Sequence, residues 1–219
     1  MKTALVIGAT GLIGRNLVFE LIKSPQFSKV TVLVRRNIEI KHDKLNQILL
    51  DFDELDKYKE AIVADTIFCC LGSTKSKTPD PILYKQIDFD YPLTVAKFAK
   101  QNGASHYLLV SSIGANVDSS VFYTKLKGEI EAAISEIGFK SFSIFRPSLL
   151  LGSRIESRPL ETITQFLMRV LNPLFIGPLK LYKAINGTEV AKALLKKAIE
   201  AKPGTEIILN NTMLDLAKD

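Results

Sequence analysis

The sequence contains few metal ligands and little sulfur: two adjacent cysteines, two histidines and no tryptophan. Cys69 and Cys70 would point to opposite faces of a strand, so a disulfide between them is not expected. Two cysteines do not make a structural zinc site without nearby histidines, and His42 and His106 lie far away in the sequence. We therefore expect buried core thiols and no metal site.

The chain also lacks a long apolar run, because no stretch reaches the roughly 18 to 20 residues that a membrane-spanning helix needs. The start, Met1 to Ile13, superficially resembles a signal peptide. Its glycines fit a turn, however, and no small-residue cleavage site follows cleanly. We interpret this run as the first strand of the fold and predict a cytoplasmic protein without a membrane span.

Clustered positive charge is absent as well. The 29 lysines and arginines exceed the 23 aspartates and glutamates, giving a net charge of +6, but they are spread along the chain. A nucleic-acid-binding protein is expected to carry a basic stripe with interleaved aromatic residues. Here the aromatic residues are mostly phenylalanines in apolar periodic positions. The sequence predicts a solvated surface that favours anionic ligands, and no nucleic-acid partner.

Short β-rich runs alternate with helical patterns along the whole chain. This alternation is typical of right-handed crossovers and of a parallel sheet covered by helices on both faces. We predict an α/β, doubly wound fold in a single domain over residues 1–219. The expected strands are Ala4–Gly8, Lys29–Val34, Gln47–Leu50, Thr66–Cys70, His106–Ser111, Ser141–Phe145 and Glu206–Leu209. The expected helices are Leu12–Lys23, a short one near Asp53–Ile62, Tyr91–Gln101, Tyr123–Ile137 and Thr188–Ala201.

Three irregular stretches interrupt this pattern, at residues 73–85, 114–120 and 149–160. Long loops at the carboxyl ends of parallel strands are where such sheets bind ligands. The apolar segment Ile163–Tyr182, broken by Pro173 and Pro178, fits a lid or wall over a pocket, a packing helix followed by a loop, or an oligomer contact. We expect a small C-terminal substrate-side segment, with insertions within about residues 149–187.

The first strand is followed by "GATGLIG", with glycines at Gly8, Gly11 and Gly14. In this position the first glycine allows a tight turn, the second lets the backbone approach a pyrophosphate, and the third lets the helix pack closely on the sheet. Amides near Leu12 and Ile13 would face the phosphates with the positive end of the helix dipole. Placed between a strand and an amphipathic helix, the glycine spacing predicts dinucleotide binding.

The end of the second expected strand reads "VLVRRN". A protein that binds NAD is expected to carry Asp or Glu there, to hold the ribose 2′-hydroxyl. Arg35 and Arg36 stand there instead, and two guanidinium groups suit a 2′-phosphate through charge-assisted bonds. The sequence thus favours NADP(H) over NAD. Gly72, which follows the fourth strand, either admits close contact with the cofactor or simply ends the strand.

Tyr123 and Lys127 are four residues apart in an expected helix, so both side chains lie on one face. An ammonium group near a phenol stabilises the phenolate and lowers the pKa of the phenol from about 10. Such a pair suits proton transfer to or from a carbonyl oxygen during hydride transfer. A hydroxyl of Ser111 or Ser112, at the end of the preceding strand, is placed to polarise the same oxygen.

These motifs together resemble the short-chain dehydrogenase/reductase superfamily over nearly the whole chain: "GATGLIG", "VRR", "FCCLGST", "VSS", "YTKLK" and "FRPSLLLG". The combination of "LVRR", "LDFDELDKY", "FCCLGSTKSK", "KGEIEA" and "ESRP" is similar to an atypical branch, which contains the animal Tat-interactive oxidoreductase and its bacterial relatives. The resemblance implies a Rossmann-like fold that binds NADPH.

The resemblance also implies a role for each matching residue. The pyrophosphate turn would be lined by Gly8, Thr10, Gly11, Leu12, Ile13 and Gly14. Arg35 and Arg36 would bind the 2′-phosphate, Leu71 and Gly72 would border the adenosine, and Asp51 would reach the adenine. Tyr123, Lys127 and Ser112 would be the catalytic residues; Lys127 would also bind the nicotinamide ribose, Leu150 would meet the carboxamide, and Arg158 would contact the cofactor.

The chain departs from the superfamily in two places. Only ten residues separate Ser112 from Tyr123, fewer than is usual, so Ser111 remains an alternative. The region after Pro147 is short, which disfavours a nucleoside-diphosphate-sugar epimerase or dehydratase. We expect an NADP(H)-dependent oxidoreductase for a small carbonyl or alcohol, or alternatively an NADPH-binding regulatory protein with little turnover. The helices that carry Phe98 and Ile130 are candidates for a homodimer contact.

Overall fold

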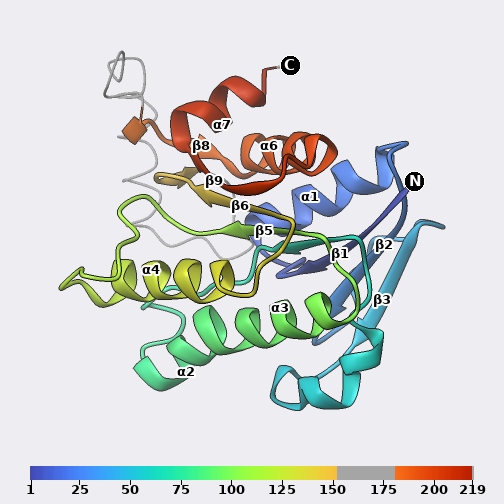
Figure 1. Cartoon of the computed structure of the whole chain (residues 1–219), viewed down its shortest axis with the longest axis horizontal. Coiled ribbons are helices and arrows are strands. Elements are labelled where there is room, and N and C mark those ends of the chain that lie inside the picture. The colour runs from blue at the N-terminus through green and yellow to red at the C-terminus, as the bar shows by residue number, and fades with distance from the viewer. Residues whose placement is uncertain (152–180, 219) are drawn as a thin grey trace.

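A computed structural model describes residues 1–151 and 181–218. Its centre is a seven-stranded parallel sheet with the strand order β3-β2-β1-β4-β5-β6-β9 (Figure 1). These strands are β1 Lys2–Ile7, β2 Phe27–Val34, β3 Leu45–Leu49, β4 Thr66–Cys69, β5 His106–Val110, β6 Ser141–Arg146 and β9 Gly204–Leu209. A separate short pair joins β7 (Leu150–Leu151) to β8 (Ile185–Asn186).

Helices cover both faces of the sheet. Figure 1 shows α1, α6 and α7 on one side and α3 and α4 on the other. The helices of the first side are α1 Leu12–Lys23, α6 Gly187–Glu200 and α7 Asn210–Leu216. The second group is the 3-10 helix η1 Phe52–Ala61, α2 Pro81–Lys85, the π-helical turn η2 Gln86–Asp90, α3 Tyr91–Gln101 and α4 Phe122–Ser135. None of the helices in the described part of the chain is long and apolar enough to cross a membrane.

The two layers of helices have separate cores, because side chains alternate along each strand. In β1, Ala4 and Val6 pack against the α1, α6 and α7 side, while Leu5 and Ile7 pack against the α3 and α4 side. All four residues of β4 are buried, as a central strand covered on both faces requires. Ile130 of α4 is fully buried in the second core, so it does not offer a dimer contact itself.

The α/β, doubly wound fold expected from the alternation is confirmed. The helices Leu12–Lys23 and Tyr91–Gln101 have the predicted bounds. The prediction of an irregular stretch at residues 73–85 is wrong in its last part, because α2 begins at Pro81 and continues into η2. Asp80 caps α2 by accepting a hydrogen bond from the Ile82 amide at 2.9 Å, and proline is favourable in a first helical turn.

Candidate cofactor-binding and active site

The predicted site residues follow four neighbouring strands at one edge of the sheet. Gly8 follows β1, Arg35 follows β2, Leu71 and Gly72 come soon after β4, and Ser111 and Ser112 follow β5. The parallel register pairs Ile7 with both Leu33 and Cys69, and Cys69 with Leu109. The carboxyl ends of these strands therefore lie side by side, which is where an open parallel sheet binds its ligand.

The turn after β1 has room only for glycine. Gly8 has a φ of +80°, and a Cβ there would lie 2.6 Å from the amide nitrogen of Leu71. A Cβ on Gly14 would lie 2.8 Å from the carbonyl carbon of Gly8. The Gly11 amide closes the turn by donating to the Gly8 carbonyl at 3.0 Å. These close approaches bring the start of α1 directly against the ends of β1 and β4.

The start of α1 has the properties of an anion site. Gly11 is its N-cap and is exposed, no side chain caps the helix, and its first turn holds no acidic residue. The first amides of a helix, here those of Leu12 and Ile13, have no partner within the helix. Thr10 is also exposed beside them. We call the exposed start of α1, from Thr10 to Ile13, the cradle. A pyrophosphate fits this cradle, because the helix dipole and the unpaired amides both favour negative charge.

Arg35 and Arg36 are both exposed just past the end of β2. Neither forms a salt bridge with any other residue in the described part of the chain. Asp51 is exposed as well, and its Oδ1 accepts a hydrogen bond from the Asp53 amide at 3.1 Å, which caps η1. The predicted adenosine-phosphate residues thus stand at the ends of adjacent strands β2 and β3.

Sequence reasoning missed a second carboxylate in this region. Asp53 Oδ1 accepts hydrogen bonds from the Tyr91 hydroxyl and from Gln86 Nε2, the latter at 2.7 Å. Burial, followed by the bond to Asp53, raises the pKa of Tyr91 well above its ordinary value. Asp53 therefore joins η1 to η2 and to the start of α3.

Tyr123 and Lys127 lie near the start of α4. Tyr123 is 38% exposed, and Lys127 Nζ is 6.0 Å from the centre of its ring. Lys127 is buried, with its Nζ 2.8 Å from Asp88 Oδ1. Burial alone would lower the pKa of Lys127, but the Asp88 carboxylate and Tyr123 outweigh it and the pKa is raised. No sequence motif identified Asp88 as a partner of the lysine.

The structure distinguishes the two serines after β5. Ser111 donates to Glu131 Oε1, and Arg146 Nε also donates to that oxygen at 3.1 Å. Ser111 is therefore held in a buried ionic cluster behind α4. Ser112 is also buried, and its Oγ has no hydrogen-bond partner among the described residues. Of the two hydroxyls, that of Ser112 is available for another group.

Of the remaining predicted residues, the structure describes Leu71, Gly72 and Leu150. Leu71 is half-buried and Gly72 is exposed; a Cβ on Gly72 would lie 3.3 Å from Asp88 Oδ1 and 3.6 Å from Lys127 Nζ. Leu150 is half-buried in β7 and packs against the core on the α1 side. Arg158 and most of the apolar segment 163–182 lie outside the described residues.

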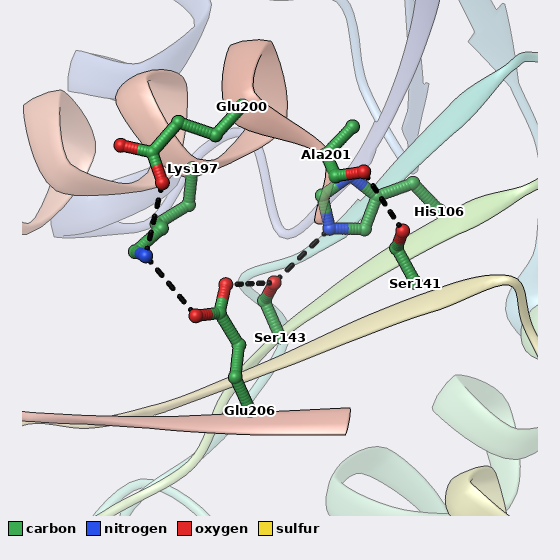
Figure 2. A network of polar contacts seen from close by, with 7 residues as sticks. All are labelled: His106, Ser141, Ser143, Lys197, Glu200, Ala201 and Glu206. Atoms are coloured by element: carbon green, nitrogen blue, oxygen red, sulfur yellow. Dashed lines mark hydrogen bonds and ion pairs between the residues drawn. The ribbon is translucent and has the colours of Figure 1, made fainter. Parts of the chain in front are cut away.

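A serine, a histidine and a glutamate also meet at the opposite, amino-terminal edge of the sheet (Figure 2). His106 Nε2 is 3.1 Å from Ser143 Oγ, which donates to Glu206 Oε1 at 3.1 Å. Lys197 Nζ pairs with Glu206 at 3.0 Å. In a hydrolase triad the carboxylate binds the histidine, whereas here it binds the serine. Burial lowers the pKa of His106 to about 4, with help from Lys2. This cluster is a structural network.

The profile of a protein family described as NAD(P)H-binding matches residues 8–140, which include the glycine turn, the arginine pair and all three candidate catalytic residues. This chain belongs to that family. The resemblance drawn from the motifs is thereby confirmed, and the start of α1 lies within the matched segment. NADP and NAD are not distinguished by membership of the family.

Two full-length relatives agree with this placement. The rat protein HTATIP2 is 35% identical over all of this chain and 90% of its own length. Protein FMP52 of Candida albicans, named mitochondrial, is 32% identical over 93% of this chain and 92% of its own length. Family membership therefore extends beyond the matched segment, into the C-terminal part.

The expected cytoplasmic location is corrected by these relatives. Several fungal relatives are named mitochondrial, although the rat protein is not. The expectation came from interpreting the apolar start as a strand. A buried first strand explains that apolar run, but proteins of any compartment contain such strands, so the strand does not indicate where the protein is located.

A solved structure supports the fold. WbmH of Bordetella bronchiseptica, in complex with NAD+, superposes with a TM-score of 0.72 over all of this chain and 79% of its own. Only 16% of the residues are identical. At this level of identity the likeness concerns the fold alone, which is the Rossmann-like arrangement of a parallel sheet and its helices.

Proposed function

We propose that this chain is an NADP(H)-dependent oxidoreductase that transfers hydride to or from a small carbonyl or alcohol substrate. The observation that carries the proposal is the pairing of Tyr123 with Lys127 on α4, with the ammonium 6.0 Å from the phenol ring. In an NAD(P)H-binding protein, a phenol and an ammonium held together are suited to proton transfer at the substrate oxygen.

The binding half of the proposal rests on charge. The first-turn amides of α1 would hold the pyrophosphate, because they are unpaired within the helix and lie at its positive end. Arg35 and Arg36 are exposed and free of carboxylates in the described structure, so both guanidinium groups can turn to a 2′-phosphate. An NAD-binding protein would be expected to carry a carboxylate at this position. We therefore infer a preference for NADP(H).

In the chemical half, a bound nicotinamide supplies or accepts the hydride, and the protein handles the proton. In reduction, the Tyr123 hydroxyl would donate its proton to the carbonyl oxygen of the substrate, which becomes the hydroxyl of the alcohol. Ser112 donates a hydrogen bond to the same oxygen and stabilises the charge that develops there. Lys127 favours the phenolate left on Tyr123 through its positive charge. Oxidation of an alcohol follows the same steps in reverse.

The proposal is tested by single-turnover oxidation of bound NADPH with a panel of aldehydes and quinones. We expect Tyr123→Phe to slow the step by about 100-fold or more, because it removes the proton donor. Tyr58→Phe, which removes a hydroxyl from η1, is the matched control and is expected to react like wild type. Turnover that is unaffected by Tyr123→Phe removes the catalytic assignment. Tight binding of NADPH with no turnover supports the alternative, a regulatory protein.

A further inference from the structure

We propose that Asp88 is a positioning residue of the active site: its carboxylate fixes the Lys127 ammonium and keeps it charged inside the protein. The proposal rests on the function proposed above for Tyr123 and Lys127. It adds a residue from a different segment of the chain, which no motif in the sequence pointed to.

The contact is short and completely enclosed. Lys127 Nζ lies 2.8 Å from Asp88 Oδ1, and the two side chains are 5% and 0% exposed. The second oxygen, Oδ2, accepts a hydrogen bond from the Ser73 amide at 2.7 Å. The two carboxylate oxygens therefore bind different partners, since one holds the lysine and the other holds the loop that follows β4.

The backbone around Asp88 is unusual in a way that suits this role. Asp88 lies in η2, a π-helical turn between α2 and α3. π-Helical turns inside helices are rare and occur frequently at functional sites. The wider turn changes which side chains face inward, and it places Asp88 in the interior while Asp90, two residues later, is exposed.

The loop held by Asp88 borders the expected cofactor site. Tyr84 donates its hydroxyl to the Ser73 carbonyl at 3.1 Å, and Ser73 Oγ lies 2.6 Å from Thr78 Oγ1. A side chain on Gly72 would press on the Asp88 carboxylate at 3.3 Å. The carboxylate thus joins the end of β4, the helices after it and α4 at a single buried point.

The physical reason for a carboxylate here is the cost of burying an ammonium. Removing a charged lysine from water is unfavourable, and a buried lysine without a partner tends to lose its proton. The other titratable groups that act on Lys127 are Tyr123 and Cys69, and Tyr84 lies beside them. Burial raises the pKa of the Cys69 thiol, so Asp88 supplies the negative charge. Without it, burial favours the neutral amine.

A neutral amine could not support the phenolate of Tyr123, since its effect depends on positive charge. Asp88 is thus expected to set the upper end of the pH range in which the pair works. The asparagine variant isolates this effect, because an amide oxygen can still accept the Ser73 hydrogen bond while the charge beside Lys127 is lost.

The direct test follows the Lys127 ammonium by NMR of the full chain with ¹³C-labelled lysine, assigned with Lys127→Arg. We expect the wild-type ammonium to stay protonated above about pH 10.4, the ordinary lysine value. In Asp88→Asn we expect its midpoint to fall by more than about one pH unit. Asp90→Asn removes the same charge from an exposed site and is expected to leave the midpoint unchanged. Equal midpoints in wild type and Asp88→Asn would overturn the proposal.

Two further measurements keep the test decisive. If Asp88→Asn does not fold, the wild-type titration alone decides, because a Lys127 midpoint at or below the ordinary lysine value contradicts the proposal. If wild type oxidises NADPH, kcat measured one pH unit above the Lys127 midpoint of Asp88→Asn is expected to be about tenfold lower in that variant than in wild type and to recover partly in Asp88→Glu, while Asp90→Asn stays within about twofold of wild type. The NMR titration needs neither cofactor nor substrate. A protein without turnover therefore fails the proposed function, and its titration still shows whether Asp88 keeps Lys127 charged.

Discussion

At the scale of single residues, the two arginines after β2 are expected to decide the choice of cofactor. Replacing both Arg35 and Arg36 by alanine should weaken NADPH binding by about 2 to 4 kcal/mol, as expected for lost charge-assisted bonds to a phosphate. NADH lacks that phosphate, so its affinity should hardly change. Isothermal titration calorimetry at near-physiological salt measures both affinities.

The control for this experiment removes the same number of positive charges from a different part of the surface. Lys23 and Lys29 are exposed at the end of α1 and the start of β2, at the other edge of the sheet. Their double alanine variant also loses two positive charges, and NADPH binding should remain close to wild type because of the distance and the screening by salt. An equal loss of NADPH and NADH affinity in the arginine variant would contradict the assigned role.

The second prediction at this scale concerns Gly14. A methyl group on Gly14 would meet the Gly8 carbonyl group, whose atoms are backbone and cannot swing away. Gly14→Ala should therefore lower the free energy of unfolding by about 1 to 3 kcal/mol and weaken NADPH binding, since the cradle has to shift. Urea unfolding and calorimetry measure the two effects. Glu20→Ala, on the same helix, should leave NADPH affinity at the wild-type value.

At the scale of elements, α4 carries the proposed catalytic pair, Tyr123 and Lys127, on one face. Tyr123, Lys127 and Glu131 are spaced four residues apart, so they lie along one line of the helix. Each meets a different part of the molecule. Tyr123 is partly exposed, Lys127 is paired with Asp88 of η2, and Glu131 binds Ser111 after β5 and Arg146 at the end of β6. Helix α4 is therefore fixed by ionic contacts as well as by its core side chains.

A substitution of Glu131 measures how much these ionic contacts of α4 contribute to stability. Its side chain is 7% exposed and its Oε2 lies 2.5 Å from the Arg146 guanidinium. Glu131→Gln should cost about 3 kcal/mol of unfolding free energy, because it leaves a partly buried guanidinium without its countercharge. Glu136→Gln, at the exposed end of the same helix, should cost less than about 0.5 kcal/mol. Guanidinium chloride would screen the ion pair, so unfolding in urea is the suitable measurement; equal losses in the two variants would rule out this role for Glu131.

The sequence predicted most elements because their causes are local. The helix Leu12–Lys23 follows from its apolar spacing and the glycine turn before it. The helix Asn210–Leu216 and the turn Gln86–Asp90 were missed. A helix of seven residues gives too short a periodic signal. The π-helical turn is stable only because its neighbours pack against it, which no local pattern reports.

At the scale of the whole molecule, the network in Figure 2 links the amino-terminal edge of the sheet to α6. This network makes the stability of the protein depend on pH. The Ser143 hydroxyl donates its hydrogen bond to Glu206, so His106 Nε2 must carry a hydrogen for its own bond to the Ser143 oxygen. The remaining nitrogen, Nδ1, is buried and has no partner among the described residues. Protonating it would bury a charge beside Lys2, and the pKa of His106 is accordingly lowered to about 4.

The folded state therefore binds fewer protons than the unfolded state between about pH 6.5 and pH 4. Stability should fall as the pH falls through this range, by about 3 kcal/mol from this histidine. Urea unfolding at pH 7.5, 6, 5 and 4 measures the slope. His106→Gln keeps a donor near Ser143 but cannot titrate, so its slope should be shallower than in wild type. His42→Gln, at an exposed site, should reproduce the wild-type slope.

The sequence by itself determined the fold class, the glycine turn before α1 and the places of Arg35, Arg36, Tyr123 and Lys127 in the chain's elements. These depend on periodicity and on close spacing along the chain, and a steric or helical pattern is complete within a few residues. Tertiary structure decided that Asp88 holds Lys127 and that Ser111 belongs to Glu131 while the Ser112 hydroxyl is left unpaired. Each of those contacts joins separate elements, and its strength comes from exclusion of water, a property of the packed molecule alone.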